Sequence, residues 1–258
     1  MLTLHLETLI TAAVFAGVRI GSLMLFPPFL GSDVIAVQMK VALTVALTAL
    51  LWPVYGPLAI HADAAGWLRI LGGEVFIGLL LGLTLQFSFE AVQFAGQIIG
   101  VQTGFSLITL LDPQTQADTP VLSIFSQLVA LLIFFRLNVH HWLLRGLAAS
   151  FAYVPPGSVM AGRAAGLGLL QAAGGIWLAG LEIAAPVVAA TLVADVALGF
   201  LGKASPQLPV VFVGLSVKTL LGLAVLAGGL SLWPRIFERE FPAAVGWGER
   251  LLHLSVGR

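Results

Sequence analysis

Six apolar stretches, most of them as long as a membrane-spanning helix, follow one another through nearly the whole sequence. A helix needs roughly 20 apolar residues to cross the hydrocarbon core of a bilayer. Backbone groups in lipid must form hydrogen bonds within their own segment, so each stretch is predicted to be a helix. The stretches are about 8–30, 37–60, 66–100, 119–135, 164–201 and 208–233, with an amphipathic piece at about 139–154 and a mixed-charge tail at 234–258.

The composition points to the same environment. Hydrophobic residues make up 59% of the 258-residue chain and charged residues only 9%, whereas soluble domains carry about 25% charged residues. The net charge is zero, which argues against a basic nucleic-acid-binding surface. Cysteine is absent, which excludes disulfides and thiolate metal sites. The predicted fold class is therefore an all-α, polytopic integral membrane protein that is not a soluble enzyme.

Two of the stretches are longer than a bilayer requires. Residues 66–100 would extend about 52 Å as one helix, whereas the hydrocarbon core is only about 30 Å thick. Such a segment is strongly tilted, continues beyond the membrane, or bends back on itself. Gly72-Gly73, Gly174-Gly175 and Pro186 are the predicted bend points if it bends.

The third stretch carries a polar stripe. Four side chains spaced 4, 3 and 4 residues apart share one helix face, with glycines beside them. One interpretation is a tightly packed helix seam in which amide groups bond across the interface. The other is the lining of a wet passage, and an oligomeric pore would allow both. The stripe comprises Gln86, Glu90, Gln93 and Gln97, and the glycines are Gly78, Gly82, Gly96 and Gly100.

Charged residues also lie inside the apolar stretches. A charge at the bilayer centre costs about 2.5–3.5 kcal/mol on insertion scales, so each should be paired or should face water or protein. A proton relay is one interpretation. Pairing within a larger assembly, or a position outside the lipid, is the interpretation we favour. These residues are Arg19, Glu74, Glu90, Glu182, Asp195 and Lys218.

The connection between the third and fourth stretches is apolar in its first half, from Gly104 to Leu111, and then reads Asp112-Pro113. It is either a hydrophobic constriction that closes a pore by excluding water or an ordinary helix end with a proline turn. His140-His141 does not predict a metal site, because adjacent helical residues point in different directions. No catalytic motif is present, so we expect neither enzymatic activity nor a cofactor.

Three blocks of sequence resemble one known family in order and spacing. The first is Gly96-Gln-Ile-Ile-Gly-Val-Gln-Thr-Gly-Phe-Ser, followed by Asp112-Pro113-Gln114 and Pro120-Val-Leu. The second is Asn138-Val-His-His-Trp-Leu-Leu, and the third runs from Ala197 to Leu208. Together they resemble the FliR family of flagellar export-gate proteins, also called FliR/SctT. Val139, where the family often has Gly, and Lys203, where it often has Arg, depart from the pattern.

The resemblance implies a fold and a role. Helical hairpins would form one wedge of a helical hetero-oligomeric pore with FliP and FliQ, beside FlhB and FlhA, in the inner membrane at the flagellar basal body. Unfolded flagellar proteins would pass through this pore as transient substrates. Residues 1–258 would form a single export-gate domain, FliP-like over about 1–154 and FliQ-like over about 155–258. Neither a cofactor nor a nucleic acid is implied.

The resemblance also implies site residues. The family's loop around Asp-Pro plugs the closed pore, which here is about 104–119. The predicted plug residues are Gly104, Phe105, Ser106, Leu107, Ile108, Leu110, Leu111, Asp112 and Pro113. The predicted helix-seam and subunit-interface residues are Gln86, Glu90, Gln93, Gln97, Gly96, Gly100, Asp195, Lys203, Pro206 and Gln207.

A small-molecule or proton-coupled secondary transporter is the alternative. Such transporters often contain inverted repeats with a binding site at broken helices, and the two long stretches here lie in dissimilar contexts. A transporter should fold and bind its substrate alone, whereas a gate subunit should need its partners.

Overall fold

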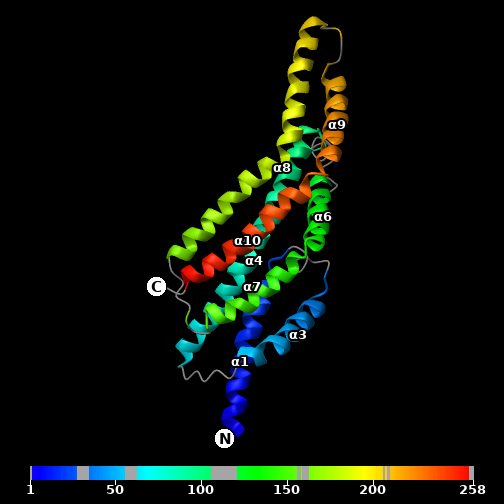
Figure 1. The fold of residues 1–258 in the computed structure, drawn as a ribbon. Helices are drawn as coiled ribbons and strands as arrows, with labels where there is room; N and C mark the ends of the chain where they lie inside the picture. The colour runs from blue at the N-terminus through cyan, green and yellow to red at the C-terminus, as the bar shows by residue number, and fades with distance from the viewer. Residues whose placement is uncertain are drawn as a thin grey trace. The chain divides into compact units, whose positions relative to one another are not determined.

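The computed structural model describes residues 2–27, 35–55, 63–105, 121–155, 158, 163–205, 207 and 210–255 (Figure 1). Every regular element in these ranges is an α-helix, which confirms the all-α fold class. The helices are α1 (Leu2–Met24), α3 (Val37–Tyr55), α4 (Ala64–Gln102), α6 (Val121–Arg136), α7 (Val139–Tyr153), α8 (Arg163–Ala204), α9 (Val210–Gly229) and α10 (Trp233–Ser255).

Among the described residues, two helices are long and apolar enough to cross a membrane by themselves. They are α4 and the part of α8 from Ala165 to Ala204. Two further spans are possible if α6 with α7, and α9 with α10, each count as one broken span. The chain is therefore a polytopic membrane protein, and the six predicted stretches correspond to between two and four spans by length and composition.

The two over-long segments are single helices. α4 has 39 residues and α8 has 42, so their backbones extend about 58 and 63 Å. The helical assignment continues through Gly72-Gly73, Gly174-Gly175 and Pro186, so the bending-back alternative is wrong. Helix tilts in membranes reach about 40°, which is too little to fit either length into about 30 Å of hydrocarbon.

The mixed-charge tail folds into a helix that the sequence analysis did not predict. α10 is amphipathic: Phe237, Phe241 and Leu251 are buried, while Arg235, Arg239 and other charged side chains are exposed. Apolar residues recur at helical spacing through this segment, and burial of that face stabilises the helix. The sequence analysis described this segment only as a mixed-charge tail, although the spacing of its apolar residues indicated an amphipathic helix.

The chain divides into two compact units, each built from separate pieces of sequence. Unit 1 comprises Met1–Phe87, Asn138–Gly174 and Phe241–Arg258, and unit 2 comprises Ser88–Leu137 and Gly175–Glu240. The core of unit 1 includes Phe15, Ile20, Leu80, Leu147, Phe151, Phe241 and Leu251. The core of unit 2 includes Phe89, Val92, Ile99, Phe134, Val187 and Phe237. The family-derived division near residue 154 stays a prediction.

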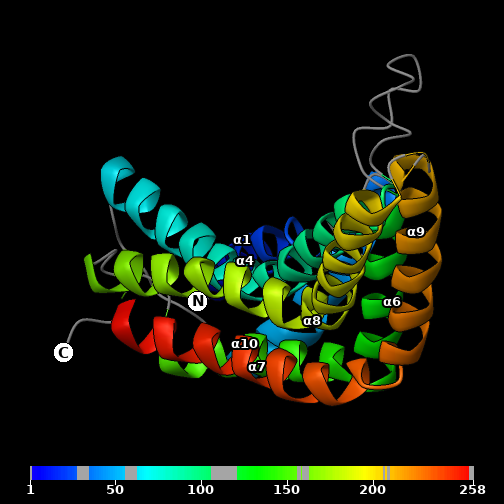
Figure 2. The ribbon, with the colours of Figure 1, turned by 90° about the horizontal axis from the view of Figure 1, so that it is seen from above.

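Helices in each unit approach closely at small residues. In unit 1, α7 lies beside the C-terminal half of α10 (Figure 2), where a Cβ on Gly146 would lie 3.8 Å from Val245. α1 packs on α3 where Gly17 and Gly21 face Thr48 and Thr44. Small residues permit close backbone approach, which is how helices associate without a hydrophobic driving force between them.

Candidate functional site

The glycines of α4 lie against neighbouring helix backbones. In unit 1, a Cβ on Gly78 would collide with the Ser22 hydroxyl and the Arg19 carbonyl of α1. One turn further along, a Cβ on Gly82 would lie 2.9 Å from the Cβ of Phe26. No side chain fits at either position without movement of the backbone, so these glycines set the spacing of α1 and α4.

Unit 2 repeats this arrangement on other helices. A Cβ on Gly96 would lie 2.6 Å from the Cα of Ser123 in α6. Gly180 of α8 faces α4, where its Cβ would lie 2.8 Å from the Ala91 carbonyl oxygen. Ser123 and Ser126 on α6 are fully buried, and their hydroxyls have no hydrogen-bond partner in the described structure. Close contact with α4 leaves no room for longer side chains there.

The polar stripe lies along the second half of α4. Gln86, Glu90 and Gln93 are half-buried and Gln97 is exposed, whereas Gly96 and Gly100 are buried. The stripe thus changes from partly covered to open toward the C-terminal end of α4. Its assignment to a subunit interface stays a prediction.

The end of α4 is fixed to α9 within unit 2. The Thr219 hydroxyl donates a hydrogen bond of 2.7 Å to the Thr103 carbonyl. Gly104 has a φ of 82°, a left-handed conformation that glycine adopts without strain, and a Cβ there would collide with Leu215. The chain therefore leaves α4 at a defined point before Phe105. The other predicted plug residues, Ser106, Leu107, Ile108, Leu110, Leu111, Asp112 and Pro113, lie outside the described residues.

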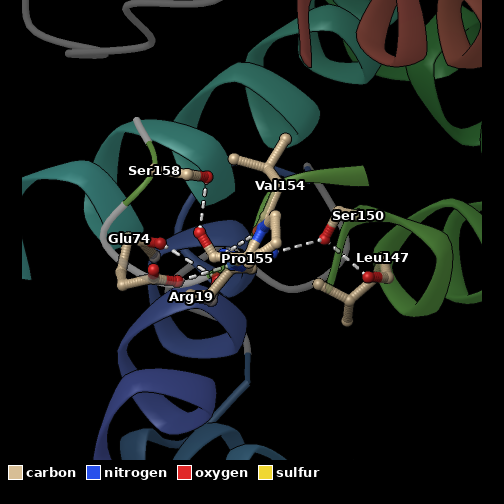
Figure 3. Close-up of polar contacts among 8 residues, drawn as sticks. Arg19, Glu74, Leu147, Ser150, Val154, Pro155 and Ser158 are labelled. Atoms are coloured by element: carbon tan, nitrogen blue, oxygen red, sulfur yellow. Dashed lines mark hydrogen bonds and ion pairs between the residues drawn. The ribbon is translucent and has the colours of Figure 1, made fainter. Parts of the chain in front are cut away.

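Arg19 is the centre of a buried polar cluster in unit 1 (Figure 3). Its Nε donates to Glu74 Oε2 at 2.6 Å, and both side chains are fully buried. Its other nitrogens donate to Ser150 Oγ at 3.2 Å and to the Val154 carbonyl at 2.9 Å. The guanidinium lies 4.3 Å from the ring centre of Phe151. One side chain of α1 thereby joins α4 and both the last turn and the C-cap of α7.

Three further ion pairs lie in unit 2, and all of their side chains are partly exposed. Lys218 Nζ is 2.9 Å from Asp195 Oδ2, between α9 and α8. Arg239 of α10 contacts both carboxylate oxygens of Glu182 at 2.8 Å and also contacts Glu240. Five of the six charges found inside the apolar stretches therefore take part in these ion pairs. The sixth, Glu90, is half-buried.

The remaining predicted positions lie near the hairpin end of α8. Lys203 and Gln207 are exposed, and Pro206 lies outside the described residues.

The rings of His140 and His141 are 4.2 Å apart. In the part of the chain that the structure describes, no three His, Cys, Asp or Glu side chains gather in a way that could hold a metal ion.

The sequence analysis identified the charged residues of these clusters but not the partners with which they interact. Arg19 and Glu74 were identified as costly charges, but they lie 55 positions apart and nothing in the sequence joined them. The contact of Thr219 with Thr103 was also missed, because threonine in a membrane helix usually bonds to its own backbone. The sequence did carry one signal of a close neighbouring helix at this charge. Gly78 follows Glu74 by four residues, so the two lie on one face of α4.

The fold and these sites define a class: an α-helical membrane protein with helices packed at glycines and with charges paired inside the chain. The model for bacterial export proteins, family 1, matches residues 10–244. The chain is 32% identical to the flagellar biosynthetic protein FliR of Escherichia coli K12 over 225 residues, covering 86% of this chain and 85% of that protein.

Two other relatives agree. The flagellar biosynthetic protein FliR of Pectobacterium carotovorum is 34% identical over 87% of this chain and 86% of its own length. The secretion system apparatus protein SsaT of Salmonella typhimurium is 29% identical over 85% and 86% respectively. The chain belongs to bacterial export proteins, family 1, the FliR/SctT family, and is a component of a type III export apparatus.

Proposed function

We propose that this chain is a non-enzymatic subunit of the flagellar export gate and that it forms the membrane pore for unfolded flagellar proteins with FliP and FliQ. The observation that carries the proposal is that the chain leaves large apolar side chains uncovered while belonging to an export family. Leu170, Val193 and Leu220 are each at least 70% exposed. Such surface needs lipid or partner subunits to cover it.

The partners follow from the same role. The gate would contain FliP and FliQ, with FlhB and FlhA beside it, in the inner membrane at the flagellar basal body. The two relatives named FliR, from Escherichia coli and Pectobacterium carotovorum, are 32% and 34% identical to this chain, and the secretion system apparatus protein SsaT is 29% identical. The higher identity to these flagellar proteins favours a flagellar role.

Co-purification tests the function against the transporter alternative. The chain is expressed in membranes with and without FliP and FliQ and is then extracted in mild detergent. A gate subunit should be recovered in a stable, homogeneous complex only when the partners are present. A chain that is equally well folded alone, and that binds a small solute, would contradict the proposal and favour a transporter.

We propose further that the segment from Gly104 to Pro113 closes the pore. Its support is the apolar sequence after Phe105 and the fixed position of α4's end, which Thr103 and Gly104 anchor to α9. Apolar side chains at a constriction exclude water and therefore ions.

Replacing Ser106–Leu111 with six serine and glycine residues tests closure at constant loop length. The assembled gate should then conduct ions in its resting state, because the polar loop no longer excludes water. Conductance is measured on the intact complex in planar bilayers. A matched replacement in the connection at 56–61 is the control, and a closed baseline in both variants would contradict the plug.

For the polar stripe we propose an interface role. Glu90, half-buried on α4, would contribute to contacts among helices of the assembled gate. Glu90→Leu should then lower the yield of complex. A normal yield with a shifted pH dependence of export would favour the proton relay instead.

A further inference from the structure

One face of α9 lies against the C-terminal end of α4 within unit 2. It is formed by Leu215, Thr219 and Gly222, which are four and three residues apart and therefore share one side of the helix. A Cβ on Gly104 would collide with the Leu215 side chain, and a Cβ on Gly222 would collide with the Thr103 methyl group. The two glycines thus permit the close approach of the end of α4 to α9.

A single hydroxyl joins the two helices. The Thr219 hydroxyl donates to the Thr103 carbonyl at 2.7 Å, and the Leu215 carbonyl of its own helix lies 2.9 Å from the same hydroxyl oxygen. A hydroxyl has one proton to donate, so these two carbonyls compete for it. α4 ends at Gln102, so the Thr103 carbonyl belongs to the first residue after the helix. The bond therefore holds the point at which the chain leaves α4.

This bond can be broken without leaving its donor unpaired. If the end of α4 moves away, the Thr219 proton turns to the Leu215 carbonyl, a bond that threonine commonly makes inside helices. An unpaired buried donor would oppose the separation, and the second acceptor removes that obstacle. The Thr103 carbonyl then needs a new donor, which water in an open pore supplies. The joint between α4 and α9 is therefore built to open as well as to hold.

Thr191 on α8 shows the ordinary arrangement in the same unit. Its side chain is fully buried, and its hydroxyl lies 2.9 and 3.0 Å from the carbonyls of Val187 and Val188, both in its own helix. Thr219 differs because the shorter of its two bonds crosses to another helix. That difference separates a threonine that bonds within its own helix from one that can hold or release a neighbouring helix.

We propose that the face of α9 formed by Leu215, Thr219 and Gly222 is a latch that holds the end of α4 in the resting gate, and that export requires its release. Thr219 is a positioning residue, because it acts through Thr103 on the place where the chain leaves α4. The latch rests on the proposed export-gate function. It adds to that function a contact inside this chain that must open before the pore does.

Conductance of the complete complex with FliP and FliQ in planar bilayers tests the hydrogen bond. Thr219→Val keeps the branched shape of the side chain but removes the donor. The yield of complex should be normal, while the share of gates open at rest should rise about two- to ten-fold, the effect of one net hydrogen bond on the closed state. Thr219→Ser keeps the hydroxyl and should give the wild-type baseline. Thr191→Val is the matched control on α8 and should also stay at that baseline.

The cysteine-free sequence allows the latch to be locked. A Cβ on Gly222 would lie 3.4 Å from the Cβ of Thr103, close to the separation that a disulfide spans. Thr103→Cys combined with Gly222→Cys should therefore crosslink in the resting gate when a membrane-permeable oxidant is added, and loss of both free thiols to a maleimide reports the bond. Export of flagellar proteins should stop in the oxidised variant and return with a reductant. Each single cysteine variant should export under both conditions.

Every outcome supports or overturns the latch. Normal export by the crosslinked gate overturns it, and so does a pair of cysteines that does not crosslink at rest. A baseline conductance in Thr219→Val, a loss of complex yield in that variant, or an equal rise in Thr219→Ser or Thr191→Val also overturns it. If the reduced double variant does not export, the conductance of Thr219→Val decides alone. A wild-type chain that forms no complex with FliP and FliQ contradicts the gate function itself, whereas a gate that exports while locked contradicts only the latch.

Discussion

Two ion pairs of this chain, Arg19 with Glu74 and Lys218 with Asp195, use the same chemistry in different settings. In unit 1, the side chains of Arg19 and Glu74 are fully buried, and Ser150 and the Val154 carbonyl occupy further guanidinium donors. In unit 2, Asp195 and Lys218 are partly exposed on an apolar hairpin. The first pair is enclosed by its own chain, whereas the second stays partly exposed. The difference separates a charge that helps to fix the internal fold from a charge that the described part of the chain leaves partly open.

The largest effect on stability is expected at Glu74, in the buried pair. Glu74→Leu leaves the Arg19 charge buried without its carboxylate, which should destabilise the fold by about 3–5 kcal/mol. The measurement is protease resistance of the chain in native membranes across a urea series.

The control is the double variant Arg19→Met with Glu74→Leu. It removes both charges and should recover most of the stability, because replacing a whole buried pair with apolar residues is often close to neutral. Equal losses in the single and double variants would show that packing, and not charge, explains the effect.

A smaller loss of stability is expected at Gly78, where α1 and α4 approach each other closely beside the buried pair. Gly78→Ala places a methyl group against the Arg19 carbonyl and the Ser22 hydroxyl, so α1 and α4 must separate. Overpacking of this kind costs about 1–3 kcal/mol. The same urea series measures it.

Gly72 provides the matched control on the same helix. A Cβ there meets nothing within 4 Å, so Gly72→Ala should stabilise the helix by about 0.5–1 kcal/mol. A destabilised Gly72→Ala together with a neutral Gly78→Ala would contradict the close approach of α1 and α4.

The smallest effect is expected at Asp195 in the chain expressed without partners. Asp195→Asn should change stability by at most about 1 kcal/mol, because exposed ion pairs contribute little. Glu74→Gln makes the same chemical change in the buried pair and should have a clearly larger effect. Similar effects at both positions would remove the distinction between the buried pair and the partly exposed pair.

Much of the fold was predictable because hydrophobicity is local. The boundaries of α3, α4, α6, α7 and α8 fall within a few residues of the predicted stretches, apart from the C-terminal end of α3. α10 was not predicted, because the many charged residues of this segment drew attention away from the helical spacing of its apolar residues. α4 and α8 proved to be unbroken helices, since single or paired glycines weaken a helix by only about 1 kcal/mol each and packing compensates for that.

The candidate site was less predictable than the fold. The stripe from Gln86 to Gln97 follows from helical spacing alone, but its burial gradient depends on which helices cover α4. Asp195 and Lys218 were identified as charges that need partners, and their pairing required the α8–α9 hairpin to bring together residues 23 positions apart. The plug assignment depends on family resemblance and stays a proposal.

By itself, the sequence determined that this chain is a bundle of membrane helices, because apolar surface and backbone hydrogen bonding are properties of each segment. Only the tertiary structure decided which charges meet and which stay exposed. A hydrogen-bonded ion pair forms only when its donor and acceptor atoms come within about 3 Å of each other, so the pairing of Arg19 and of Asp195 depends on helix contacts that the spacing along the chain does not encode.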